Sequence, residues 1–107
     1  MEVTEAVLEG CLGQKVGDVV QRLGLAECRW GWADEPPCVL RGAFYRPADS
    51  VRVALYVATD ETLFRQFNVR RDWDYDAFLK CRVGGIQYRS GVACFDVGSA
   101  IPWQWRP

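Results

Sequence analysis

Two neighbouring segments of the chain repeat one five-residue pattern, and this echo constrains the fold more than any other feature. The segments are Arg41–Tyr45 and Arg52–Tyr56, and each has arginine, alanine and tyrosine at alternate positions. Alternate residues of a β-strand lie on the same face of a sheet, so each segment would present these three side chains together. Residues 47–50, Pro-Ala-Asp-Ser, are typical of a tight turn. The echo therefore predicts a β-hairpin.

The pattern also predicts the register of this hairpin. Antiparallel strands run in opposite directions, so each arginine of one segment faces the tyrosine of the other, and the two alanines face each other. The predicted pairs are Arg41 with Tyr56, Ala43 with Ala54, and Tyr45 with Arg52. The same register places Gly42 opposite Leu55, a small residue facing a large one. The predicted surface has two-fold-like symmetry, with a small centre and an arginine and a tyrosine at each end.

The opposite face of the hairpin is apolar, and we expect it to form the core. Its members are Leu40, Phe44, Val51, Val53, Leu55 and Val57. Helices would cover this face first and leave the other face open. Tyrosine and arginine are enriched among the residues that dominate protein interfaces. We therefore predict a binding site, called here the Arg/Ala/Tyr face, made of Arg41, Ala43, Tyr45, Arg52, Ala54 and Tyr56.

A purely structural role is the alternative for the Arg/Ala/Tyr face. Its alanines would let helices pack closely, its tyrosines would be partly buried, and each arginine would stack on the tyrosine opposite. Such a cation–π pair contributes ~0.5–1 kcal/mol at an exposed site. We favour the contact surface, because the apolar face competes for the same helices.

Two segments before the hairpin have helical periodicity, residues 3–12 and residues 16–23. In the second, an apolar stripe of valines and a leucine is followed by Gly24, which can adopt the left-handed conformation that often ends a helix. These segments predict a helical hairpin at the N-terminus. Residues 29–37 are predicted to be an irregular connection, because Pro36 and Pro37 cannot donate hydrogen bonds to a sheet.

Two short helices and a second hairpin are predicted after the first hairpin. One helix begins at Thr59 or Asp60, and its inward residues are Leu63, Phe64 and Phe67. The other begins after Asp74, with Trp73 at the spacing that packs onto Phe78. Residues 86–88 and 92–97 form the strands of the second hairpin. The predicted fold is a single α+β domain over residues 1–107, with a helical hairpin followed by a four-stranded antiparallel sheet (ββααββ) and helices on one face.

The composition excludes several classes of function. The formal net charge of −1 gives no general attraction to nucleic acid or to an anionic membrane, so we expect neither as a partner. The chain has no histidine, which removes Ser-His-Asp and Cys-His catalysis together with the usual metal ligand. Its five cysteines form no CxxC pair. We expect no metal, no cofactor and no enzymatic activity.

The sequence also shows no signal peptide pattern, no membrane-spanning stretch and no complete calcium-binding motif. The N-terminus lacks a basic region followed by an apolar run, and no apolar stretch approaches the ~20 residues that span a bilayer, so we expect a cytoplasmic protein. The acids of residues 72–76 alternate as in a calcium loop, but the sixth position is Ala77 and the twelfth is Val83. Helix capping explains these acids better.

The leading hypothesis is a small non-enzymatic module that binds another protein, or itself, through the Arg/Ala/Tyr face. One alternative is a small-ligand or glycan binder that uses the tryptophan pairs Trp30 with Trp32 and Trp103 with Trp105. A second alternative is a carboxylate-dependent hydrolase, for which a pair of acids such as Asp34 with Glu35 would do the acid/base work. Sealing the edges of a small core is the competing explanation for the tryptophans.

Overall fold

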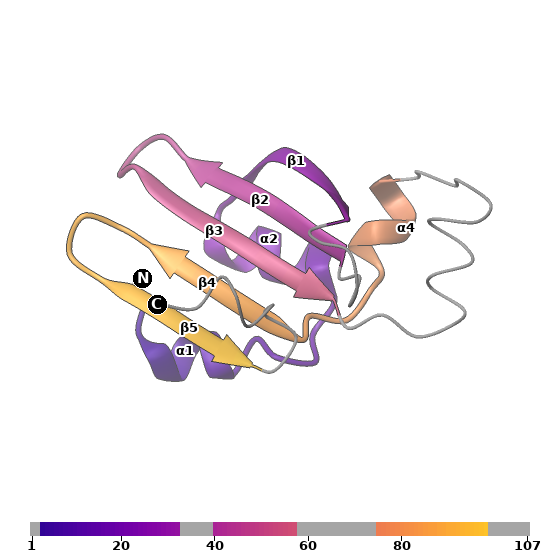
Figure 1. Cartoon of the computed structure of the whole chain (residues 1–107), viewed down its shortest axis with the longest axis horizontal. Coiled ribbons are helices and arrows are strands. Elements are labelled where there is room, and N and C mark those ends of the chain that lie inside the picture. Colours follow the sequence, from indigo (N-terminus) through magenta and orange to yellow (C-terminus); the bar gives the residue numbers. More distant parts are fainter. Residues whose placement is uncertain (1–2, 33–39, 58–74, 99–107) are drawn as a thin grey trace.

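An antiparallel sheet with helices behind it forms the protein, as the computed structural model shows (Figure 1). The structure describes residues 3–32, 40–57 and 75–98, with 27–32 described by their backbone. Its strands pair in chain order: β1 (Ala26–Trp32), β2 (Leu40–Arg46), β3 (Val51–Val57), β4 (Gly85–Arg89) and β5 (Cys94–Gly98). The helices within these ranges are α1 (Glu5–Glu9), α2 (Val16–Leu23) and α4 (Tyr75–Leu79). The predicted α+β class and antiparallel sheet are confirmed.

The predicted register of the first hairpin is confirmed at every position. Strands β2 and β3 pair Arg41 with Tyr56, Ala43 with Ala54, and Tyr45 with Arg52. The predicted turn at residues 47–50 joins them, and its last residue, Ser50, adopts a φ of 56°. Because strand residues alternate between faces, this register fixes which side chains face the helices.

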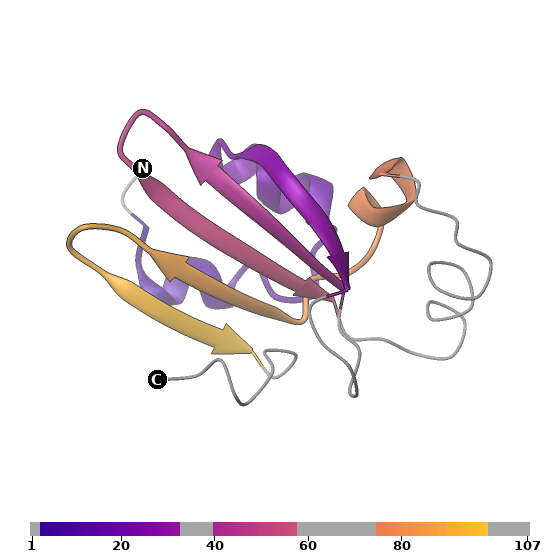
Figure 2. The same ribbon diagram turned by 45° about the horizontal axis from the view of Figure 1, so that its top comes forward.

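The core forms on the predicted apolar face. None of its six residues is more than 3% exposed: Leu40, Phe44, Val51, Val53, Leu55 and Val57. The helices add Leu8, Val16, Val19, Leu23 and Phe78, and the second hairpin adds Ile86, Tyr88 and Val97. Full burial of one such side chain contributes about 1.5–3 kcal/mol, so this face determines which side of the sheet the helices occupy. Helices α1 and α2 remain on that side when the view is turned (Figure 2).

Gly42 lies where the core comes closest to the backbone of the sheet. It pairs with Leu55, as predicted. A Cβ atom at position 42 would lie 2.5 Å from Cε2 of Phe44 and 2.9 Å from Cε2 of Phe78. Both phenyl rings are buried, so neither can move aside freely. The space above Gly42 is therefore filled by two aromatic rings, and only glycine fits.

Helix α2 matches its predicted bounds, whereas α1 is shorter than expected. Gly24 ends α2 with a φ of 63°, and the amide of Leu25 donates to the carbonyl of Val20 at 2.9 Å. Helix α1 stops at Gly10 instead of continuing to residue 12, and its fully buried residue is Leu8. The predicted helical hairpin is not confirmed, because α1 lies beside β5 while α2 lies beside α4.

The prediction of an irregular connection over residues 29–37 is wrong for its first part. Strand β1 extends to Trp32 and pairs with β2, with a bulge between Glu27 and Arg29. A proline removes a hydrogen-bond donor only at its own position, and the aromatic residues of β1 favour a strand. Strand β1 thus adds a strand to the predicted sheet.

Other predicted elements fall partly or wholly outside the described residues. These are residues 33–37 of the connection, the helix from Thr59 or Asp60 with Leu63, Phe64 and Phe67, and the capping residues Trp73 and Asp74. The ββααββ order is therefore not confirmed. Helix α4 itself begins at Tyr75, as expected, and buries Phe78. The second hairpin is confirmed as β4 and β5.

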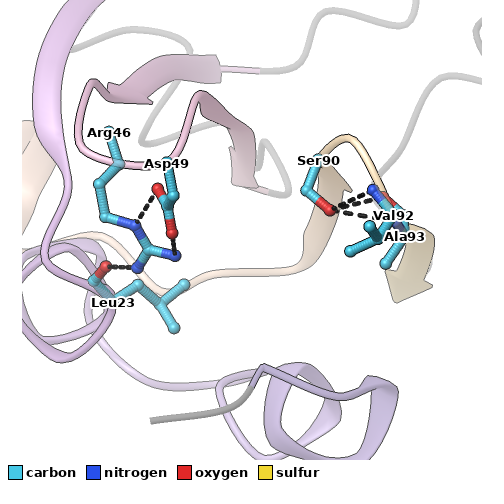
Figure 3. Close-up of polar contacts among 6 residues, drawn as sticks. All are labelled: Leu23, Arg46, Asp49, Ser90, Val92 and Ala93. Atoms are coloured by element: carbon cyan, nitrogen blue, oxygen red, sulfur yellow. Dashed lines mark hydrogen bonds and ion pairs between the residues drawn. The ribbon is translucent and has the colours of Figure 1, made fainter.

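Polar contacts fix both hairpin turns (Figure 3). Arg46 donates to both carboxylate oxygens of Asp49 at 2.8 Å, and its Nη1 donates to the carbonyl of Leu23 at 2.6 Å. This side chain therefore ties the β2–β3 turn to the end of α2. In the other turn, Oγ of Ser90 accepts from the amides of Val92 and Ala93. The hydrogen bonds from Arg46 lower the pKa of the Asp49 carboxyl.

Replacement of Gly42 by alanine is predicted to destabilise the fold by about 1–3 kcal/mol, because the added methyl would overpack the core. Urea denaturation measures this change. The matched control is Gly91→Ala, since position 91 is exposed and a Cβ there meets nothing within 4 Å. The control is expected to change stability by no more than about 0.5 kcal/mol. Equal effects of both substitutions would contradict the packing described for Gly42.

Asp49 is predicted to titrate below its ordinary value of 3.8 in the folded protein. A carboxyl whose folded pKa is lowered stabilises the fold above its unfolded pKa, and this contribution is lost as the pH falls through the folded pKa. NMR titration of the side-chain carboxyl carbon measures the value. Arg46→Ala is expected to return the pKa towards 3.8, and an unchanged pKa would show that Arg46 is not the cause.

Candidate functional site

A hollow of about 490 Å³ opens on the Arg/Ala/Tyr face. Five of the six predicted residues line it, together with further residues of β2, β3 and β4: Arg41, Ala43, Tyr45, Arg52 and Ala54, with Phe44, Val53, Gln87 and Arg89. Its volume lies within the range of about 300–1,000 Å³ that is usual for ligand sites. The predicted face is therefore concave, with alanines at its centre and guanidinium groups around them.

Gln87 and Arg89 belong to the site because β4 lies next to β3. Strand pairing places Gln87 opposite Ala54 and Arg89 opposite Arg52, so both share the face of the predicted residues. The sequence analysis missed these two residues. The alternation of polar and apolar residues in the second hairpin was the available signal, but it needed the additional knowledge that β3 and β4 are neighbours.

Tyr45 and Arg52 form the exposed end of the face. The guanidinium carbon of Arg52 lies 5.9 Å from the centre of the Tyr45 ring, a cation–π contact that the structural alternative predicted for this pair. Arg52 is exposed and Tyr45 is half-buried. These two side chains are accessible to a partner.

Tyr56 is fully buried, which corrects the expectation of an open contact residue. Its hydroxyl donates to Oε1 of Gln87 at 2.7 Å. Across β4 its neighbour is Gly85, which has no side chain to compete for the same space. Burial raises the pKa of Tyr56, and the positive charge of nearby Arg41 opposes this effect. Tyr56 is therefore inaccessible to a partner, and it is not among the described residues that line the hollow.

The remaining members of the face, Arg41, Ala43 and Ala54, are buried or half-buried. Ala54 is 7% exposed, and Ala43 and Arg41 are half-buried. Small side chains at the centre keep the hollow open between the larger ones. A half-buried arginine beside a buried tyrosine is well placed to be rigid, which lowers the entropy lost on binding.

Arg89 is held in place by several groups. Its Nη2 lies 2.8 Å from Oδ1 of Asp96, and its Nη1 donates to the carbonyls of Tyr88 and Phe95 at 3.0 and 3.1 Å. Asp96 is on β5, opposite Gln87. The charge of Arg89 is thus partly compensated, while its position at the rim of the hollow is fixed.

The structure describes the residues of the alternative hypotheses only through the backbone of Trp30 and Trp32. In β1, the backbone of Trp30 pairs with Gly42 and that of Trp32 pairs with Leu40. Trp103 and Trp105 lie outside the described residues, as do Asp34 and Glu35. Glycan binding and carboxylate-dependent hydrolysis therefore remain predictions.

The cysteines with described side chains are free thiols: Cys11, Cys81 and Cys94. Burial raises the pKa of Cys11 more than nearby Arg22 lowers it, so this thiol is protonated at neutral pH. Over residues 3–26, 40–57 and 75–98, no three residues of the histidine, cysteine, aspartate and glutamate types are grouped as a metal site requires. The chemistry of the described site consequently lies in its arginines and tyrosines.

Models of known protein families, curated proteins and solved structures were each compared with the chain, and none matches it. Within the described part of the chain, every helix is too short or too polar to cross a bilayer. The geometry of the Arg/Ala/Tyr face is therefore the basis for proposing a function.

Loss of the Tyr56 hydroxyl is predicted to destabilise the fold. Tyr56→Phe removes its hydrogen bond to Gln87 and is expected to cost about 0.5–1.5 kcal/mol in thermal or urea unfolding. Tyr45→Phe is the control, because that ring is half-buried, and its expected effect is within about 0.5 kcal/mol. A larger effect at Tyr45 than at Tyr56 would reverse the roles assigned to the two tyrosines.

Proposed function

We propose that this chain is a non-enzymatic binding module that captures another protein through the Arg/Ala/Tyr face. The observation that carries the proposal is the hollow of about 490 Å³ on that face. Ala43 and Ala54 leave space for an anchoring side chain of the partner, and Tyr45 and Arg52 are accessible beside it. Tyrosine and arginine around a concave centre are typical of the positions that dominate binding energy.

The partner in this proposal is a different protein, although the near-symmetry of the face had suggested a homodimer. Three arginines line the hollow, and the described lining residues include no acid. A two-fold interface places the same patch against itself, so it would bring these positive charges together. Such juxtaposition of like charges costs binding energy. A partner with complementary charge avoids this cost.

The proposal retains the cytoplasmic location and the absence of a metal, a cofactor and a nucleic-acid partner as expectations from composition. The net charge of −1 remains the reason for expecting no nucleic acid. Glycan binding and hydrolysis are not proposed, because no described contact supports either.

Reversal of the Arg52 charge is predicted to abolish partner capture without unfolding the protein. Arg52 is exposed, so Arg52→Glu should leave the circular dichroism spectrum and melting temperature nearly unchanged. Arg41→Ala is less informative, because Arg41 is half-buried beside Tyr56. Affinity capture from a lysate of the native host, with quantitative mass spectrometry, should show proteins that bind the original chain and are lost with Arg52→Glu.

Lys80→Glu is the matched control for this experiment. It makes the same change in charge at an exposed position beyond the end of α4. Its captured proteins should equal those of the original chain. The proposal fails if both variants capture the same proteins in the same amounts.

A further inference from the structure

We infer that the partner contacts this face with an acidic segment, in which a carboxylate binds between Arg52 and Arg89 and a neighbouring apolar side chain rests on Ala43 and Ala54. The inference depends on the proposed function and specifies the chemistry of the partner. Its basis is the pairing of two arginines on neighbouring strands of the sheet.

Arg52 and Arg89 are directly opposite each other on β3 and β4. Directly paired residues of adjacent strands share one face of the sheet, and both arginines line the hollow. Like charges at directly opposite positions destabilise an antiparallel pair, and a bound anion would relieve the repulsion. A carboxylate bound between these two guanidinium groups would therefore be stabilised by both positive charges.

The two arginines differ in how their charge is compensated. Arg89 is ion-paired with Asp96 and held by two backbone carbonyls. Arg52 contacts the ring of Tyr45 and makes no ion pair with any described residue. Arg52 consequently provides an accessible guanidinium, while Arg89 adds positive potential from a fixed position. A guanidinium fork can bind a carboxylate through two parallel hydrogen bonds.

The centre of the hollow favours an apolar group next to that carboxylate. The methyl groups of Ala43 and Ala54 line it, while the side chains of Phe44 and Val53, which also border it, are buried on the core face. A side chain seated there would exclude water from the adjacent ion pair and so strengthen it. An acidic residue next to an aliphatic or aromatic one satisfies both parts of the site.

A protein segment fits these observations better than a polyanion or a second copy. Nucleic acid presents a long run of phosphates, whereas three arginines line this hollow in a chain with net charge −1. A two-fold copy would place the arginines against one another.

The test is a selection of random octapeptides, displayed on phage, against the folded full-length chain. We expect selected peptides to be enriched in aspartate or glutamate next to an apolar residue. Fluorescence polarisation with the labelled synthetic peptides then gives their Kd. Arg52→Gln should weaken binding roughly tenfold or more, because it removes a charged hydrogen-bonding partner. Arg52→Lys should weaken it less, since the charge stays but the fork is lost.

Lys80→Gln is the control and should leave the Kd unchanged. Added salt should weaken binding to the original chain and have less effect with Arg52→Gln. Peptides that are apolar or basic but still depend on Arg52 would overturn the acidic partner while leaving the protein-binding proposal intact. Failure to select any Arg52-dependent peptide would also overturn it, and the capture experiment would then decide the wider proposal.

Two further measurements identify the competing occupants. A mixed-sequence single-stranded oligonucleotide that binds at physiological salt and is lost with Arg52→Gln would assign the face to nucleic acid. Self-association in sedimentation velocity that disappears with Arg52→Gln would assign it to a second copy of the chain. Either result would overturn the inference.

Discussion

The antiparallel pairing of β2 with β3 is the interaction on which the rest of the structure depends. Its register places the apolar residues of both strands on one face, where the helices bury them. A slip of one residue would exchange the two faces and expose the core. Gly42 allows the rings of Phe44 and Phe78 to pack onto the sheet, and the Arg46 side chain ties the turn to α2. The same register places the arginines, alanines and tyrosines of both strands together on the other face of the sheet.

The Arg/Ala/Tyr face carries three arginines around a small alanine centre. Opposing arginines on β3 and β4 would be costly unless the charge is compensated. Asp96 compensates Arg89, and the ring of Tyr45 partly stabilises Arg52. In the proposed complex, an acidic partner would compensate the charge of Arg52 as Asp96 compensates that of Arg89.

Local signals in the sequence were enough to predict a large part of the fold. The echo predicted the register of the first hairpin, and Gly24 predicted the end of α2. What could not be predicted depends on contacts between distant segments. Strand β1 was not predicted, because Pro36 and Pro37 indicate an irregular connection and the pairing of β1 with β2 is evident only in the folded sheet.

In the candidate site, too, local features were predictable and contacts between distant segments were not. Five of its six predicted residues line the hollow, because strand alternation is a local property. The burial of Tyr56 depends on Gly85 and Gln87, which lie about thirty residues further along the chain. Arg89 was missed for the same reason. Residues of the distant strand β4 complete the site, and no local sequence pattern predicts that β4 pairs with β3.

Alanine methyl resonances offer the most direct test of the central claim that the Arg/Ala/Tyr face is the contact surface. The spectrum of methyl-labelled protein would be recorded with and without a captured partner or selected peptide. We predict that the methyls of Ala43 and Ala54 shift on binding, while those of Ala6 on α1 and Ala77 on α4 do not. Shifts confined to Ala6 or Ala77, with Ala43 and Ala54 unchanged, would contradict the claim.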